Sequence, residues 1–119
     1  MKFLADIMKR VEILNDGRAA FLTISSKELE NQGLEMDDSR DVIDLIMNIE
    51  GVQVSCLIRE DFANLFKLSF RSKGSIEVLE IARDFGGGGH KFAAGASTEE
   101  NIAQIKKMFI DYTNKKLNE

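Results

Sequence analysis

Residues 85–96 read FGGGGHKFAAGA, and this stretch restricts the fold and function more than any other part of the chain. Its glycines are Gly86, Gly87, Gly88 and Gly89, and they precede the only histidine, His90. Glycine costs about 0.5–1 kcal/mol relative to alanine in ordered structure. Without a Cβ, however, successive backbone N–H groups can approach an anion and form a nest around it. A helix beginning near His90 would add a positive dipole end. The stretch therefore favours a phosphate site, with a flexible loop as the alternative.

The commoner phosphate-binding motifs are absent. No window matches the P-loop pattern Gly-x-x-x-x-Gly-Lys-Ser/Thr, and Lys91 and Phe92 occupy the positions where a dinucleotide-binding pattern needs its third glycine. One histidine and one cysteine cannot make a Cys/His metal cluster. An acidic group at 37, 38, 41 and 44 is typical of a solvated helix start, because the helix dipole favours carboxylates there.

A second candidate site precedes the glycines. Arg71 ends a predicted strand, LFKLSFR at 65–71, whose Lys67, Ser69 and Arg71 share one face. Ser72 follows with a hydroxyl. A guanidinium can hold a phosphate through two donors. Because a short predicted helix links Arg71 to the glycines, both could lie at one edge of the sheet, where α/β folds tend to bind ligands. A solvated strand end is the alternative.

Working outward, hydrophobic periodicity predicts an α/β fold with a small mixed sheet of about five strands, flanked by helices, in a single domain. Residues 1–10 form a connector or first helix, and residues 11–119 form the domain. Residues 11–14 either extend that helix or begin a strand, with a hairpin at Asp16-Gly17. Further strands are expected at 18–25, 52–58 and 65–71. Helices are expected at 27–32 (capped by Ser26 and stopped by Gly33), from Asp37 or Asp38 to Gly51, at 76–85 (capped by Ser75), and from Ser97 or Thr98 onward.

Composition limits the class of protein. The net charge of −4 argues against extensive binding along a nucleic-acid backbone but permits a local site for one or two phosphates. No apolar run is long enough to span a bilayer, and the first residues do not resemble a secretory signal. Cys56 is the sole cysteine, so no internal disulfide can form. We expect a cytoplasmic protein.

Taken together, FKLSFRSKG at 66–74, the segment 76–82 and the glycine stretch resemble the DHH-associated C-terminal domain of DHH-family phosphoesterases. The branch that it resembles most is that of the oligoribonuclease and 3′-phosphoadenosine-5′-phosphate phosphatase. The resemblance extends from about residue 10 to the end, and its Gly-Gly-Gly-His-x-x-Ala-Ala-Gly string is quite specific.

The resemblance implies that Arg71, Ser72, the backbone of Gly86 to Gly89, and His90 hold the phosphates of short RNA or of a phosphorylated nucleotide. It also implies a partner catalytic domain with an Asp-His-His motif that binds two divalent metals, usually manganese. No Asp-His-His occurs in this chain, so we expect no catalytic residues, metal or cofactor within it and no efficient hydrolysis by it alone.

Three other functions remain open. A cyclic-dinucleotide or polyphosphate phosphodiesterase domain would share this architecture. A nucleic-acid-binding appendage, as in alanyl-tRNA synthetases, would need more positive charge than this chain carries. A dimerisation module could form a homodimer through the alanine-rich patch and the apolar stripe of the last helix.

Overall fold

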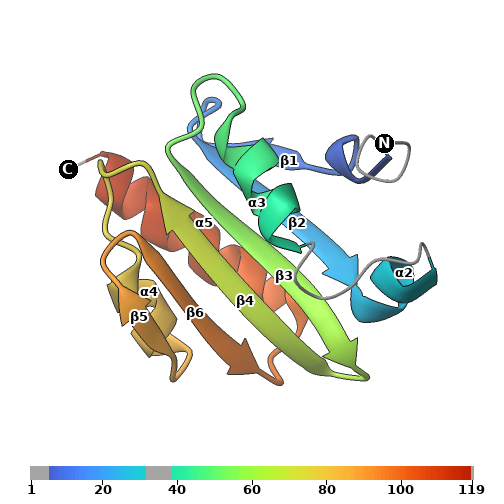
Figure 1. Cartoon of the computed structure of the whole chain (residues 1–119). Helices are drawn as coiled ribbons and strands as arrows, with labels where there is room; N and C mark the ends of the chain where they lie inside the picture. Colours follow the sequence, from blue (N-terminus) through green and yellow to red (C-terminus); the bar gives the residue numbers. More distant parts are fainter. Residues whose placement is uncertain (1–5, 32–38, 119) are drawn as a thin grey trace.

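The computed structural model of the chain describes residues 6–31 and 39–118, which form a mixed sheet with helices on both faces (Figure 1). Six strands follow the order β1-β2-β3-β4-β6-β5. Their bounds are β1 Glu12–Leu14, β2 Ala19–Ser25, β3 Val54–Phe62, β4 Leu65–Ser72, β5 Gly88–His90 and β6 Ala93–Thr98. The predicted α/β class and mixed sheet are therefore confirmed, with one strand more than the approximate five.

The first hairpin turns at Asp16-Gly17, as predicted. β1 runs antiparallel to β2, with Leu14 opposite Ala19, so the segment before the turn begins a strand and does not extend a helix. Asn15, Asp16 and Gly17 all have positive φ angles. Asparagine, aspartate and glycine tolerate that conformation best, which explains why the chain turns here.

β2 and β3 are the only parallel neighbours in the described sheet, and Phe21 lies opposite Cys56. Parallel strands need a crossover connection. Here the crossover contains α2 (Ser26–Asn31) and α3 (Ser39–Met47). The predicted helix stop at Gly33 and the predicted caps at positions 37 and 38 lie outside the described residues.

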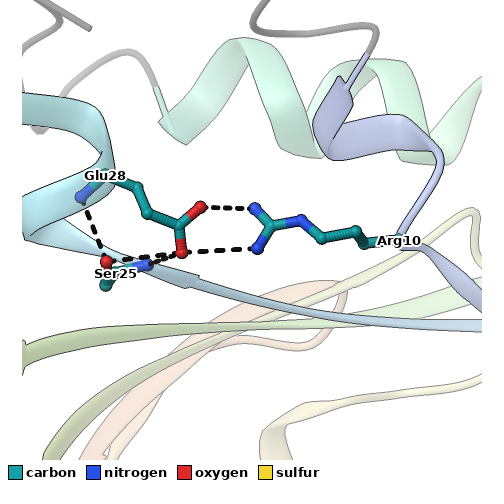
Figure 2. Close-up of polar contacts among 3 residues, drawn as sticks. All are labelled: Arg10, Ser25 and Glu28. Carbon is teal, nitrogen blue, oxygen red and sulfur yellow. Dashed lines mark hydrogen bonds and ion pairs between the residues drawn. The ribbon is translucent and has the colours of Figure 1, made fainter. Parts of the chain in front are cut away.

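α2 begins one residue earlier than predicted, because Ser25 and not Ser26 caps it (Figure 2). The Glu28 N–H donates to Ser25 Oγ at 3.0 Å, and the Ser25 N–H donates to Glu28 Oε1 at 3.2 Å. This reciprocal capping box satisfies two backbone donors. Ser26 Oγ instead donates to Asp61 at 2.7 Å. Arg10 grips the same Glu28 carboxylate at 3.3 and 2.6 Å, which ties the segment before β1 to α2.

One face of the sheet is covered by α4 (Leu79–Asp84) and α5 (Ile102–Leu117). Its core contains three fully buried phenylalanines from β2, β4 and α5. The Phe109 ring centroid lies 6.0 Å from that of Phe21 and 6.3 Å from that of Phe70, distances typical of favourable aromatic packing. These contacts join the parallel and antiparallel parts of the sheet in one core.

The other face is covered over only part of its width. Leu22 of β2 and Leu57 of β3 pack with Val42 and Ile46 of α3, and Ile7 joins this second core. Among the described residues, no member of this second core comes from β4, β5 or β6. Figure 1 shows α3 lying over β2 and β3, with α5 behind the sheet. We call the part of this face that is formed by β4, β6 and β5, and that contributes nothing to the second core, the open half.

Two helices in the second part of the chain start later than predicted. α4 begins at Leu79, and its N-cap Val78 makes no side-chain capping bond, so Ser75 is not the cap. α5 begins at Ile102, where Asn101 Oδ1 accepts the Gln104 N–H at 2.8 Å. Ser97 and Thr98 do not begin this helix, because they complete β6. No described helix has both the length and the apolarity needed to cross a membrane.

Candidate functional site

The first half of the glycine run terminates α4. Gly86 has a φ of +82°, which glycine adopts without strain. Its N–H donates to the Arg83 carbonyl at 2.9 Å, and the Gly87 N–H donates to the Ala82 carbonyl at 2.8 Å. This pair of bonds is a Schellman motif, which satisfies carbonyls that the helix end would otherwise leave unpaired.

The second half of the run is a strand. β5 pairs antiparallel with β6, placing Gly88 opposite Gly95 and His90 opposite Ala93. No helix begins near His90 to add a dipole end, because the chain turns at Lys91-Phe92 and returns as β6. The small-residue patch is a strand of the sheet, and any free glycine amides on β5 belong to a sheet edge.

Three of the four glycines are required by the fold. A Cβ on Gly87 would lie 2.6 Å from Ala96 Cβ, and one on Gly89 would lie 2.7 Å from Ala94 Cα. Gly86 needs its positive φ. Gly88 differs: its φ lies outside the left-handed region, and a Cβ there would meet no atom within 4 Å. Packing and backbone geometry therefore leave the absence of a side chain at Gly88 unexplained.

The strand register brings the predicted arginine and histidine to the same face. Arg71 on β4 lies opposite Ala93 on β6, which lies opposite His90 on β5. Directly opposed residues of an antiparallel pair project from the same side of the sheet. Arg71 and His90 therefore belong to one row across the open half. His90 is exposed at the edge strand.

Ser72 lies differently from the other predicted site residues. Neighbouring strand residues alternate between faces, so it projects away from the open half. Its Oγ accepts the Gly74 N–H at 3.1 Å and the Ile76 N–H at 3.4 Å, while its own N–H donates to the Phe92 carbonyl at 3.0 Å. Ser72 thus closes the turn that follows Arg71, and its hydroxyl proton remains free to donate.

The open half contains a shallow hollow of about 430 Å³. Its floor includes Gly88 and Gly95, and polar side chains surround it. Those polar lining residues are Lys67, Ser69, Arg71 and Ser97. The sequence indicates that Lys67 and Ser69 share the face of Arg71, but no role follows from that pattern alone. The sequence does not indicate Ser97 as a site residue, because a serine at this position resembles the cap of the last helix.

The cationic side chains of the open half, Arg71 and Lys67, form no hydrogen bond or ion pair with the other described residues, although the charge of Lys67 acts on the Asp61 carboxylate. Arg59, opposite Lys67 on β3, differs because its Nε lies 2.5 Å from Asp61 Oδ1. Partial burial raises the pKa of Asp61, but hydrogen bonds from Arg59 and Ser26 and the charges of Arg59 and Lys67 outweigh it and lower that pKa below its usual value.

Ser55 is a buried polar residue beside this row. It lies opposite Arg71 on β3, it is 1% exposed, and its Oγ has no hydrogen-bond partner among the described residues. Buried hydroxyls in proteins usually have such a partner. The buried hydroxyl therefore lies in the same cross-strand row as Arg71, at the inner border of the open half.

Other candidate groups do not converge. No described cluster of three or more His, Cys, Asp and Glu residues could hold a metal ion. Asp41 and Asp44 are exposed on α3, and positions 37 and 38 lie outside the described residues. Burial raises the pKa of the Cys56 thiol far above its usual value, which makes the thiolate inaccessible near neutral pH. Among the described residues, the polar groups that do converge are the lysine, arginine and serines around the hollow.

The sequence of this chain is similar to a known domain family and to several known phosphoesterases. A family model, the DHHA1 domain, matches residues 16–115. The chain is 40% identical over 76 residues to the bifunctional oligoribonuclease and PAP phosphatase NrnA of Thermus thermophilus, covering 64% of this chain and 23% of that protein. It is 31% identical over 105 residues to the cyclic-di-AMP phosphodiesterase PdeA of Listeria monocytogenes, covering 87% of this chain and 15% of that protein.

The fold also matches solved structures. A crystal structure of an exopolyphosphatase-related protein from Bacteroides fragilis superposes with a TM-score of 0.80 at 24% identity, covering 96% of this chain and 34% of that one. The chain spans about a quarter to just over a third of the length of its NrnA relatives. The family match covers nearly the whole described domain, and the chain therefore belongs to the DHHA1 family, the domain that accompanies the catalytic domain in DHH phosphoesterases.

Proposed function

We propose that this chain is the substrate-binding domain of a metal-dependent phosphoesterase and that its open half binds the phosphates of short oligoribonucleotides or 3′,5′-bisphosphate nucleotides. The observation that carries the proposal is Arg71, whose unpaired guanidinium lines a hollow floored by glycine. A guanidinium offers two parallel donors that match phosphate geometry. His90 does not line the hollow itself, but it is exposed in the same row as Arg71 and would add a ring donor beside it.

The division of labour follows from what this chain lacks. Its described residues do not assemble a metal site, so hydrolysis belongs to the partner domain, where we expect manganese. The residues of this chain bind and orient. Holding a phosphate in a fixed position removes much of the entropic barrier to its reaction. On this proposal the isolated chain binds nucleotides but does not hydrolyse them.

A calorimetric titration with 5′-phosphorylated diadenylate tests the site. Replacing Arg71 by alanine removes a charge-assisted pair worth roughly 1.5–3 kcal/mol, so we expect about tenfold weaker binding or more. We expect His90→Ala to weaken binding less, since it removes a single donor. Neither variant should shift the unfolding midpoint, because His90 is exposed and Arg71 makes no hydrogen bond or ion pair with other described residues.

Arg83→Ala is the matched control, because Arg83 is an exposed arginine on α4, away from the hollow. The proposal predicts unchanged affinity in this variant. If Arg71→Ala, His90→Ala and Arg83→Ala all bound the diadenylate like the unaltered chain, the site assignment would be wrong.

A cyclic dinucleotide is the second candidate ligand. The similarity to the cyclic-di-AMP phosphodiesterase, at 31% identity, covers 87% of this chain. Both ligands present phosphates, so the unpaired Arg71 suits either. Competition between the linear diadenylate and cyclic di-AMP distinguishes them: the preferred substrate class should displace the other at lower concentration.

A further inference from the structure

The open half is longer than one phosphate site needs. Lys67 and Arg71 lie four residues apart on β4 and share a face, because side chains alternate along a strand. At a rise of roughly 3.3 Å per residue, their Cα atoms are about 13 Å apart. Both residues line the same hollow. The hollow therefore has a cation toward each end.

The end at Lys67 has its own polar environment. Ser97 on β6 lies opposite Lys67, and both side chains are exposed. Arg59 lies opposite Lys67 on the other side, but Asp61 neutralises its charge. Lys67 forms no ion pair with another described residue, although its charge also acts on Asp61, so this end presents an ammonium group beside a hydroxyl.

A smooth floor separates the two cations. The row between them contains Ser69, Gly95 and Gly88, opposed across β4, β6 and β5. A Cβ on Gly95 would lie 2.9 Å from the Leu68 carbonyl oxygen, so packing explains that glycine. Packing does not explain Gly88. Its missing side chain instead keeps the hollow free for an uncharged group such as a sugar or base.

We infer that Lys67 and Ser97 form a second anion subsite and that the open half binds a linear ligand with tandem phosphates, laid along β4. One phosphate contacts Arg71, an uncharged part of the ligand lies over Gly88 and Gly95, and a later phosphate contacts Lys67. The inference rests on the proposed function and extends it: a chain of several nucleotides makes a contact that a mononucleotide cannot reach.

The test compares ligands of increasing length. Adenosine 5′-monophosphate and 5′-phosphorylated di- and triadenylate are titrated calorimetrically into the full chain and its variants at low salt. We expect Lys67→Ala to weaken triadenylate binding about fivefold, as for a partly exposed charge pair, and to leave the monophosphate unchanged. The salt dependence for triadenylate should become shallower by about 0.7 in log–log slope, because one phosphate contact to a single strand is lost. Lys115→Ala, an exposed lysine on α5 on the other face, is the charge-matched control.

Gly88→Ala probes the floor without altering the charge. Because its methyl group meets no protein atom, the unfolding midpoint should not fall. Triadenylate affinity should fall severalfold, because the methyl occupies space that the ligand uses. Unchanged affinity in Gly88→Ala would place the ligand elsewhere and overturn this part of the inference.

The remaining outcomes separate the two proposals. Equal weakening of the monophosphate and triadenylate by Lys67→Ala would indicate a general charge effect and overturn the second subsite, as would no weakening of either. If Arg71→Ala left monophosphate binding unchanged, or if no ligand bound the unaltered chain, the proposed function itself would fail. Both proposals are supported if Arg71→Ala weakens the binding of all ligands and Lys67→Ala weakens the binding of the longer ligands only.

Discussion

The region of the sheet under α3 and the open half beside it belong to the same face of one sheet but are built from different strands. Leu57 of β3 lies opposite Ser69 of β4, so the border between the two regions falls between adjacent strands. On the covered side, Leu22, Leu57 and their neighbours form a closed apolar core. On the open side, the equivalent positions hold lysine, serine, arginine and glycine. Polar side chains and glycines thus occupy the part of the face that lies outside the second core, which favours its use as a binding surface.

The largest expected effect comes from exchanging residues at that border. Leu57→Ala removes buried apolar volume under α3, and such changes typically cost about 2–5 kcal/mol of unfolding free energy. Ser69→Ala, directly opposite, should change it by less than about 0.5 kcal/mol, as surface substitutions do. Urea denaturation of both variants measures the difference. Similar midpoints would show that the two regions do not differ as described.

The glycine run offers the next comparison, between neighbours. We expect Gly87→Ala to cost about 1–3 kcal/mol, because its Cβ would overlap Ala96 and force the hairpin to shift. We expect Gly88→Ala to be neutral or to stabilise by about 0.4–1 kcal/mol, because alanine restricts the unfolded chain. Thermal unfolding of the two variants gives the contrast, and a clear loss of stability in Gly88→Ala would contradict the open space above that residue.

The crossover that carries the covered region depends on its helix caps. Ser25→Ala removes one acceptor of the capping box at the start of α2, and we expect a loss of about 1 kcal/mol of unfolding free energy. Ser25→Asp should recover most of that loss, because aspartate is also a good cap. A Ser25→Ala variant as stable as the original chain would show that the box contributes nothing measurable.

The smallest expected effect concerns Asp61, which neutralises Arg59 at the border of the open half. Its pKa is lower in the folded chain than the usual value of 3.8, so its stabilising contribution is complete above about that pH and disappears as the pH falls through the folded value. Unfolding free energies measured between neutral and acidic pH should therefore fall less steeply below pH ~4 in Asp61→Asn than in the original chain. An identical acid dependence in both would contradict the lowered pKa.

Residues that alternate between two faces locate β3 and β4, whereas β2 is located by the turn signal before it, because its apolar run is buried on both faces of the sheet. Alternation could not locate β5 and β6, whose glycines and alanines show none and resemble loop residues. Misreading Ala93 to Ala96 also moved the predicted start of α5 onto Ser97. The sequence offers two adjacent serines, Ser25 and Ser26, as the cap of α2. Ser25 is the cap because the Glu28 side chain accepts its N–H.

For the site, the sequence identified Arg71, His90 and the glycines, and the register then placed Arg71 and His90 in one row. It could not assign Lys67 or Ser97, because their proximity depends on the pairing of β4 with β6. Nor could it separate Gly88 from its three neighbours, since the reason for each glycine is a contact or a φ angle that appears only in three dimensions.

The buried thiol at the centre of the sheet has a practical consequence. The chain has no tryptophan, which limits intrinsic fluorescence as a reporter of unfolding, but Cys56 is its single cysteine and is shielded in the native state. An alkylating reagent can modify it only after β3 is exposed, so the rate of modification measures how often the domain opens. The opening rate of every variant described above can therefore be measured from alkylation of Cys56, without an added label and without a second cysteine.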